Sequence, residues 1–371
     1  MTYYLCFQAV SDKFVDLRLP WESMNLRDIG NLFVIGFEGT QLSNPLRSLL
    51  EDLNPSGVIL FSRNIENPVQ LAELNRDIQR LGRPAGGFFI GVDQEGGRVR
   101  RLREPFTLFP PALEMVSGQE PEIAVKDFAR TTAREISLVG FNLDFTPVLD
   151  VLTHPDDLQS SVIGDRAYGF DPETVSRFAT ILIQELRANG IIPCGKHFPG
   201  HGGTLVDSHV DLPVDSRSLE LIERKDLIPF RNAVNLGVEM MMTAHVLYPE
   251  IDPENPATLS TVILNGLLRQ RMSYDGIVIT DDLDMGAVAD RYSTEDCSLK
   301  AFSAGADILL ICKHPEKAFA ARNKIFRAIH DGELSRQRVE ESLERIRNLK
   351  TKYAKSMNPC DPAAARSHFK I

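Results

Sequence analysis

Eight short apolar runs recur along the chain, each followed by a longer segment, and this alternation limits the possible folds more than any other feature. Several of the runs are apolar without alternation, which is typical of parallel strands buried on both faces. The runs are Leu32–Phe37, Gly57–Phe61, Phe88–Val92, Leu143–Pro147, Ile192–Lys196, Met240–His245, Gly276–Thr280 and Ile308–Ile311. Eight strand–helix pairs in 371 residues predict one α/β domain, a (β/α)8 barrel of the TIM type, with a doubly wound open sheet as the alternative.

The segments between the apolar runs have helical periodicity. Pro172–Asn189 carries proline in its first turn and is followed by Gly190, which is how helices commonly begin and end. The other predicted helices are Pro68–Leu81, Pro121–Val139, Ser218–Leu236, Ser260–Met272, Ser298–Ala304, Pro315–His330 and a charged amphipathic segment, Glu333–Tyr353.

The alternation also predicts the domain boundaries. The barrel should span residues 24–355, because the alternation begins and ends there. Residues 1–23 do not fit the pattern, so we expect an N-terminal extension or a misassigned start. Residues 356–371 form a C-terminal tail, and from Asn358 onward it lacks periodicity, so we expect this part to be frayed.

The net charge and the cysteine content limit the kinds of partner that the protein can bind and the cellular compartment in which we expect it. A net charge of −10 argues against nucleic acid and against an anionic membrane surface. No apolar run approaches the roughly 18 residues that a membrane-spanning helix needs, and the N-terminal segment lacks the features of a signal peptide. Five widely spaced cysteines provide neither a disulfide framework nor a CxxC pair. We therefore expect a cytoplasmic protein with reduced thiols, which binds neither nucleic acid nor membrane.

Polar side chains follow four of the apolar runs, at the point where each predicted strand ends, while the strands themselves are nearly free of charge. Any one of these residues alone could be a loop cap or an ion-pair partner. Because the carboxyl ends of barrel strands share one face, and that face carries the active site, we expect them to lie close together. They are Asp93, Lys196, His197, His245, Asp281 and Asp282.

The segment Lys196–His209, KHFPGHGGTLVDSH, combines titratable side chains with glycines and a proline that favour a loop. Asp207 and His209 are separated by one residue, so in an extended loop they point to the same side. A carboxylate beside an imidazole fixes its tautomer and stabilises its protonated form, as a general acid/base requires. With Asp281 held rigidly at a strand end, this pair could split an acetal by double displacement.

Metal binding is an alternative interpretation of the same loop. His197, His201, His209 and Asp207 could ligate zinc in a barrel hydrolase. However, their spacing is not that of a helical i, i+4 pair, and no HxH motif ends a strand. We therefore expect no metal and no other cofactor.

Five motifs together resemble glycoside hydrolase family 3, and more narrowly its single-domain bacterial β-N-acetylglucosaminidases of the NagZ type. The resemblance spans roughly residues 31–350, in the right order and spacing, whereas the stretch before Met24 has no family counterpart. The motifs are DQEGGRVRRL at 93–102, IGDRAYG at 163–169, KHFPGHG at 196–202, DSH at 207–209 and ITDDLDMGAV at 279–288.

The resemblance implies a role for each matching residue. Asp281 matches the nucleophile, and His209, with Asp207 as its partner, matches the acid/base on a mobile loop. The residues that match the shell binding the hydroxyls of a terminal N-acetylglucosamine are Asp93, Arg101, Arg166, Lys196 and His197. The implied substrate is the N-acetylglucosamine–1,6-anhydro-N-acetylmuramic acid unit, with or without its peptide, released in cell-wall recycling, and the implied enzyme is a monomer.

Two other functions stay open at this point. A glycoside phosphorylase could use the same dyad, because histidine repels attacking phosphate less than a carboxylate would. A non-catalytic sugar-binding barrel is the third possibility, although the presence of Asp281, His209 and Asp207 argues against it.

Overall fold

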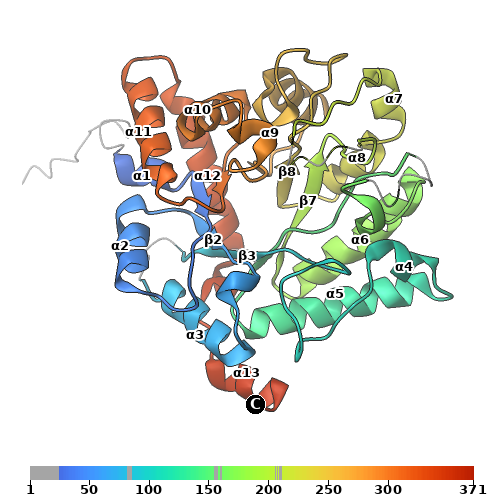
Figure 1. Ribbon diagram of the computed structural model, residues 1–371, viewed down its shortest axis with the longest axis vertical. Coiled ribbons are helices and arrows are strands. Elements are labelled where there is room, and N and C mark those ends of the chain that lie inside the picture. The colour runs from blue at the N-terminus through green and yellow to red at the C-terminus, as the bar shows by residue number, and fades with distance from the viewer. Residues whose placement is uncertain are drawn as a thin grey trace, which may run out of the picture.

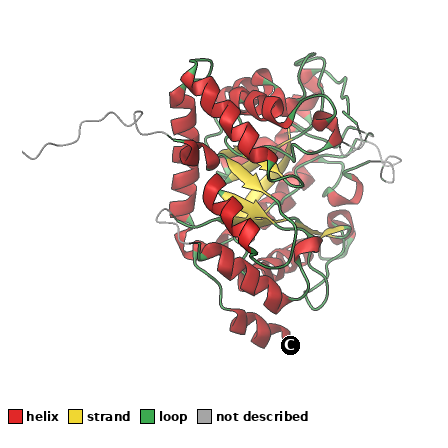
Figure 2. Ribbon diagram, turned by 60° about the vertical axis from the view of Figure 1, so that its left-hand side comes forward, coloured by secondary structure: helices red, strands yellow, loops and turns green. Residues whose placement is uncertain are grey.

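Eight parallel strands form the centre of the molecule, and helices surround them (Figure 2). The structure is a computed structural model, which describes residues 25–81, 86–153, 158, 161–204, 206, 208 and 211–371. The strands are β1 Phe33–Ile35, β2 Gly57–Ile59, β3 Phe89–Val92, β6 Leu143–Asp144, β7 Ile192–Phe198, β8 Met240–Thr243, β9 Ile277–Ile279 and β10 Leu309–Ile311. Each of these strands lies within or overlaps one of the eight apolar runs.

The strands follow one another around a ring in the order β10-β1-β2-β3-β6-β7-β8-β9. β1 pairs with β10 through the register Phe33↔Leu309, so the first and last strands are neighbours. A parallel bridge between Ile279 and Ile308 joins β9 to β10 and completes the ring. The predicted (β/α)8 barrel is therefore confirmed, and the open sheet is excluded.

The helices lie outside the ring of strands (Figure 1). Most begin at a residue that suits a helix start; for example, the Asp171 carboxylate accepts a hydrogen bond from the Thr174 N–H at the first turn of α6. The helices are α1 Leu26–Gly30, α2 Asn44–Leu53, α3 Pro68–Gln79, α4 Ala112–Ser117, α5 Pro121–Leu138, α6 Pro172–Ala188, α7 Leu219–Arg224, α8 Leu227–Asn235, a π-helix Val262–Arg271, α9 Gly286–Ala289, α10 Thr294–Ala304, α11 Lys317–His330, α12 Arg336–Lys352 and α13 Pro362–Phe369.

Two predicted helices differ in detail from the observed ones. The segment predicted as one helix, Ser218–Leu236, forms α7 and α8 instead, because the backbone at Lys225 (φ −128°, ψ −71°) leaves the helical region. The segment Ser260–Met272 contains a π-helix, a wider helix with i→i+5 hydrogen bonds.

The expectation of a frayed C-terminal tail is wrong. Pro362–Phe369 is the helix α13, which packs against α3 and α5 at the bottom of Figure 1. Ala365 is fully buried, and the Phe369 ring lies 4.5 Å from the ring of Phe106, centroid to centroid. Tertiary contacts therefore order this segment, whose sequence alone shows no clear apolar stripe.

The extension predicted at residues 1–23 lies outside the described residues. Among the described residues, no helix is long and apolar enough to cross a membrane. The four cysteines of the described ranges, Cys194, Cys297, Cys312 and Cys360, are free thiols.

Candidate active site

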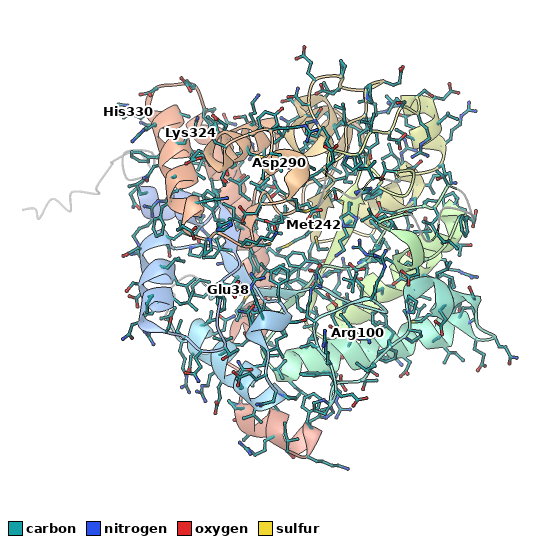
Figure 3. The ribbon with its side chains drawn as sticks, viewed as in Figure 1. Glu38, Arg100, Met242, Asp290, Lys324 and His330 are labelled. Atoms are coloured by element: carbon teal, nitrogen blue, oxygen red, sulfur yellow. The ribbon has the colours of Figure 1, made fainter. Side chains whose placement is uncertain are left out.

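A pocket of about 150 Å³ opens at the carboxyl ends of the strands. Met242, in β8, lines it and lies near the centre of the molecule in Figure 3. The predicted site residues that line the pocket are Asp93, Arg101, Arg166, Lys196, His197 and Asp281. Segments far apart in the sequence therefore meet in one place, as expected for a barrel.

Two predicted site residues are not among the described ones. Asp207 and His209 lie outside the described residues, although Ser208, between them, lines the pocket. Of the other two polar residues predicted at strand ends, Asp282 also lines the pocket, whereas His245 is fully buried and is not among the described residues that line it.

An alternating chain of charges crosses one side of the pocket. The Lys196 ammonium lies 2.9 Å from a carboxylate oxygen of Asp93 and 2.6 Å from one of Glu95. Arg101 donates to Asp93 at 3.0 Å, and Arg166 donates to both oxygens of Glu95 at 2.8 Å each. Three cations thus hold two carboxylates. These side chains come from β7, from a two-stranded hairpin formed by β4 (Gln94–Gly96) and β5 (Val99–Arg100) and the residues beside it, and from the 3-10 turn Gly164–Arg166 after β6.

The charges in this chain stabilise one another. Burial alone would raise the pKa of Asp93 and of Glu95, but Lys196 and Arg101 lower that of Asp93, and Arg166 and Lys196 lower that of Glu95. The same carboxylates raise the pKa of Lys196 and of Arg166 against the effect of burial. Asp93, Glu95, Lys196 and Arg166 are therefore ionised near neutral pH, and their fixed charges suit the binding of sugar hydroxyls.

Glu95, which was not among the predicted site residues, bridges two of them, Lys196 and Arg166. Glu95 lies two positions after Asp93, and β4, Gln94–Gly96, is extended, so the two carboxylates share one side of the chain. That spacing, within a motif already singled out, was the available signal.

A third carboxylate, the buried Asp150, holds His197 of β7 and the backbone of His201 in the loop that follows. It lies 2.8 Å from Nδ1 of His197 and accepts the backbone N–H of His201 at 2.6 Å. An ionised Asp150 fixes Nδ1 of His197 as the donor, so Nε2 is the ring atom that can meet a ligand. Asp150 was not among the predicted site residues either, because it lies past the end of a predicted strand and no motif surrounds it.

His201 is held as a neutral ring. Burial and the nearby His197 together lower its pKa to about 4, against the opposing effect of Asp150. Among the described residues, no group of three His, Cys, Asp or Glu side chains could hold a metal ion. Asp207 and His209, two of the four residues considered for zinc, are not covered by that finding.

Two adjacent carboxyl groups follow β9 and have different surroundings. The Oδ1 atom of Asp281 accepts the N–H of Asp282 at 2.8 Å, and Thr243 accepts the N–H of Asp281 at 3.4 Å. Burial raises the pKa of Asp282 to about 6, although its carboxylate accepts the backbone N–H groups of Asp284 and Cys312. Several hydrogen bonds thus hold the backbone segment that carries the Asp281 carboxyl group.

Residues 10–349 match the model of the glycosyl hydrolase family 3 N-terminal domain. The chain belongs to glycosyl hydrolase family 3. The match begins at residue 10, inside the stretch 1–23 for which the sequence resemblance offered no counterpart. Known proteins agree with this assignment. The chain is 44% identical over 286 residues to a β-hexosaminidase of Thiobacillus denitrificans, which covers 76% of this chain and 77% of that protein.

Solved structures are similar as well. NagZ from Neisseria gonorrhoeae, in complex with N-trifluoroacetyl-D-glucosamine, is 33% identical with a TM-score of 0.76, over 92% of this chain and 94% of that one. A family 3 β-N-acetylglucosaminidase from Paenibacillus sp. str. FPU-7 is 34% identical with a TM-score of 0.83, over 90% of this chain and 63% of that longer one. The resemblance noted in the sequence is confirmed, and this chain is a glycoside hydrolase of the β-hexosaminidase type.

Proposed function

We propose that this enzyme is a retaining exo-β-N-acetylglucosaminidase that acts by double displacement, with Asp281 as the nucleophile. The observation that carries the proposal is the meeting of Asp281 with the charge chain of Asp93, Lys196 and Arg166 in one pocket. A pocket of about 150 Å³ has room for one sugar ring, which favours removal of a terminal unit.

In the first step, a carboxylate oxygen of Asp281 attacks the anomeric carbon, and the glycosidic bond breaks. His209, oriented by Asp207, donates a proton to the departing oxygen. In the second step, His209 takes a proton from water, which attacks the glycosyl-enzyme and releases the sugar with its original anomeric configuration. These two roles rest on the sequence motif DSH at 207–209.

The sugar would be held by the charged side of the pocket. Asp93 can accept hydrogen bonds from hydroxyls, and Arg166, Lys196 and Arg101 can donate them. His197 presents Nε2, because Asp150 occupies Nδ1. We expect no metal or other cofactor in this reaction.

The substrate we propose is N-acetylglucosamine–1,6-anhydro-N-acetylmuramic acid, with or without its peptide, from cell-wall recycling. The sequence resemblance supports it, as do the β-hexosaminidase relatives and the similar structure named NagZ. We also propose that the enzyme works in the cytoplasm, on the cysteine pattern of the sequence, and that it is a monomer, as the sequence resemblance implies.

The test compares chromogenic β-N-acetylglucosaminide and β-glucoside substrates side by side, then the anhydro disaccharide with product identification by mass spectrometry. We expect hydrolysis of the first substrate to dominate, and release of free N-acetylglucosamine from the disaccharide. Each assay is run in phosphate and in non-phosphate buffer, and with and without EDTA. A sugar 1-phosphate product would favour the phosphorylase, and a loss of activity in EDTA that zinc restores would favour a metal enzyme. Equal rates on both glycosides, or an inert disaccharide, would contradict the proposed substrate.

A further inference from the structure

Three buried side chains form a hydrogen-bonded chain beneath Asp281. The Thr243 and Thr258 hydroxyl oxygens lie 2.7 Å apart, and the Thr258 oxygen lies 2.8 Å from Nδ1 of His245. Thr243 ends β8, His245 follows it, and Thr258 lies in the 3-10 turn Ala257–Leu259. All three are completely buried.

The two ends of this chain form hydrogen bonds to the backbone on both sides of the peptide bond between Asp281 and Asp282. Thr243 accepts the N–H of Asp281 at 3.4 Å, and Nε2 of His245 lies 3.0 Å from the carbonyl oxygen of Asp282. Between these two contacts, the N–H of Asp282 donates to Oδ1 of Asp281 at 2.8 Å. The peptide unit between Asp281 and Asp282 thus orients the Asp281 carboxylate. The hydrogen-bonded chain holds the backbone on both sides of this peptide unit, so the orientation of the carboxylate depends on the chain.

The protons can be assigned along the chain. A carbonyl oxygen only accepts, so Nε2 of His245 carries a proton and donates it to Asp282. Thr243 accepts from Asp281, so its own proton can go to Thr258. The single proton of Thr258 can reach either Nδ1 of His245 or the Ala244 carbonyl, 2.9 Å away. Both arrangements keep the two contacts to the backbone around Asp281.

We propose that His245, Thr258 and Thr243 are positioning residues that aim the Asp281 carboxylate at the anomeric carbon. The proposal rests on the role of Asp281 as the nucleophile. None of the three is among the described residues that line the pocket, so they act through the backbone and not by touching the sugar. A misplacement of a reacting group by about 1 Å can cost about 100-fold in rate, which is the scale of effect such a chain controls.

The test uses paired substitutions at Thr258. Thr258→Val removes the hydroxyl but keeps the shape, whereas Thr258→Ser keeps the hydroxyl. The matched control is Thr132→Val, the same change at a buried threonine of α5. Three quantities are measured: kcat/KM for a nitrophenyl β-N-acetylglucosaminide, the inhibition constant of free N-acetylglucosamine, and the rate of covalent labelling of Asp281 by a 5-fluoro glycosyl fluoride of N-acetylglucosamine.

We expect Thr258→Val to lower kcat/KM and the labelling rate together by about 10- to 100-fold, while the inhibition constant changes by less than about threefold. Thr258→Ser should recover most of the rate, and Thr132→Val should change neither rate. A merely structural role would weaken binding of the sugar as much as it slows labelling, or would affect the serine and valine variants alike. Either of those results, or full activity of Thr258→Val, overturns the proposal.

A second pair, Thr243→Val and Thr243→Ser, gives the same readout if Thr258→Val fails to fold. The failure of this proposal is distinguishable from that of the proposed function. If Asp281 is not the nucleophile, the wild-type enzyme itself carries no label on Asp281. If Asp281 is labelled and the valine variants label at the wild-type rate, only the positioning chain is contradicted.

Discussion

At the scale of single residues, the carboxyl groups of the pocket have different surroundings, and these determine which role each group can perform. Asp93 and Glu95 are buried among cations, which keep both ionised and unavailable as acids near neutral pH. Asp281 is held by the backbone, and its neighbour Asp282 is half-buried, with no cation among its hydrogen-bond partners in the described residues. The proposed proton donor is then a histidine, His209, whose ordinary pKa of about 6.5 suits proton transfer near neutrality.

The His209→Ala substitution tests that division of tasks. We expect it to slow natural disaccharides far more than a nitrophenyl glycoside, because a nitrophenolate departs without needing a proton. Asp207→Ala should give the same pattern more weakly. The measurement is kcat/KM across substrates whose leaving groups differ in pKa. Equal losses for all leaving groups would mean that His209 positions the sugar instead of donating a proton.

The raised pKa of Asp282 predicts a pH-dependent stability. A folded-state pKa of about 6, above the usual value of 3.8, means that the stabilisation is complete below about pH 4 and is lost as the pH rises through 6. Asp282→Asn keeps an oxygen to accept the two backbone N–H groups and cannot ionise. Relative to wild type, we expect it to gain about 1–2 kcal/mol of unfolding free energy between pH 4.5 and pH 7.5.

Urea unfolding at both pH values measures this difference. The matched control is Asp290→Asn, at an exposed carboxylate nearby in sequence. The account would be contradicted if the two variants showed the same change with pH, or if Asp282→Asn lost stability at pH 7.5 relative to wild type.

At the scale of elements, the eight strands were predictable because burial on both faces demands continuous apolar runs, which the sequence shows directly. The helices were less predictable from the sequence than the strands. The break at Lys225 and the helix α13 depend on contacts between distant segments, which periodicity within one window does not report. For the same reason, the roles of Glu95 and Asp150 were not predicted. Their partners Arg166 and His197 lie 71 and 47 residues away in the sequence, respectively.

The packing of α13 predicts a measurable contribution to stability. Phe369→Ala removes a ring that packs on Phe106 and is only 9% exposed, so we expect a loss of about 2–3 kcal/mol. Activity should be retained, because this helix packs on α3 and α5 and adds no residue to the pocket lining. Ile371→Ala, at a side chain that is 47% exposed, is the control. Equal melting temperatures for wild type and Phe369→Ala would show that the segment is frayed after all.

At the scale of the whole molecule, closure of the barrel gathers residues from Asp93 to Asp281 around one pocket. Residues that are far apart in the sequence therefore lie close together around the ring. This is why the ends of the predicted strands were a useful guide to the position of the site. The sequence could not reveal how the side chains pair there, because each ion pair depends on the exact stagger of neighbouring strands.

Deletion of residues 1–23 tests the extent of the barrel. The described fold begins with its own cap, since the side chains of Asn25 and Asp28 satisfy each other's backbone N–H groups at the start of α1. We therefore expect a chain starting at Met24 to keep its activity and nearly the same melting temperature. Because the family match begins at residue 10, the truncation also asks whether residues 10–23 belong to the fold. An insoluble product, or a markedly lower melting temperature, would show that they do.

The central claim is that Asp281 forms a covalent bond to the sugar. The most direct measurement is trapping with an N-acetylglucosaminyl fluoride that carries a second fluorine at C5, followed by proteolysis and tandem mass spectrometry. We predict one sugar per chain, attached to Asp281, and no label on Asp281→Asn, whose turnover should fall by about three orders of magnitude or more. A label on Asp282 or another residue, or no covalent adduct together with release of the inverted anomer, would contradict the account.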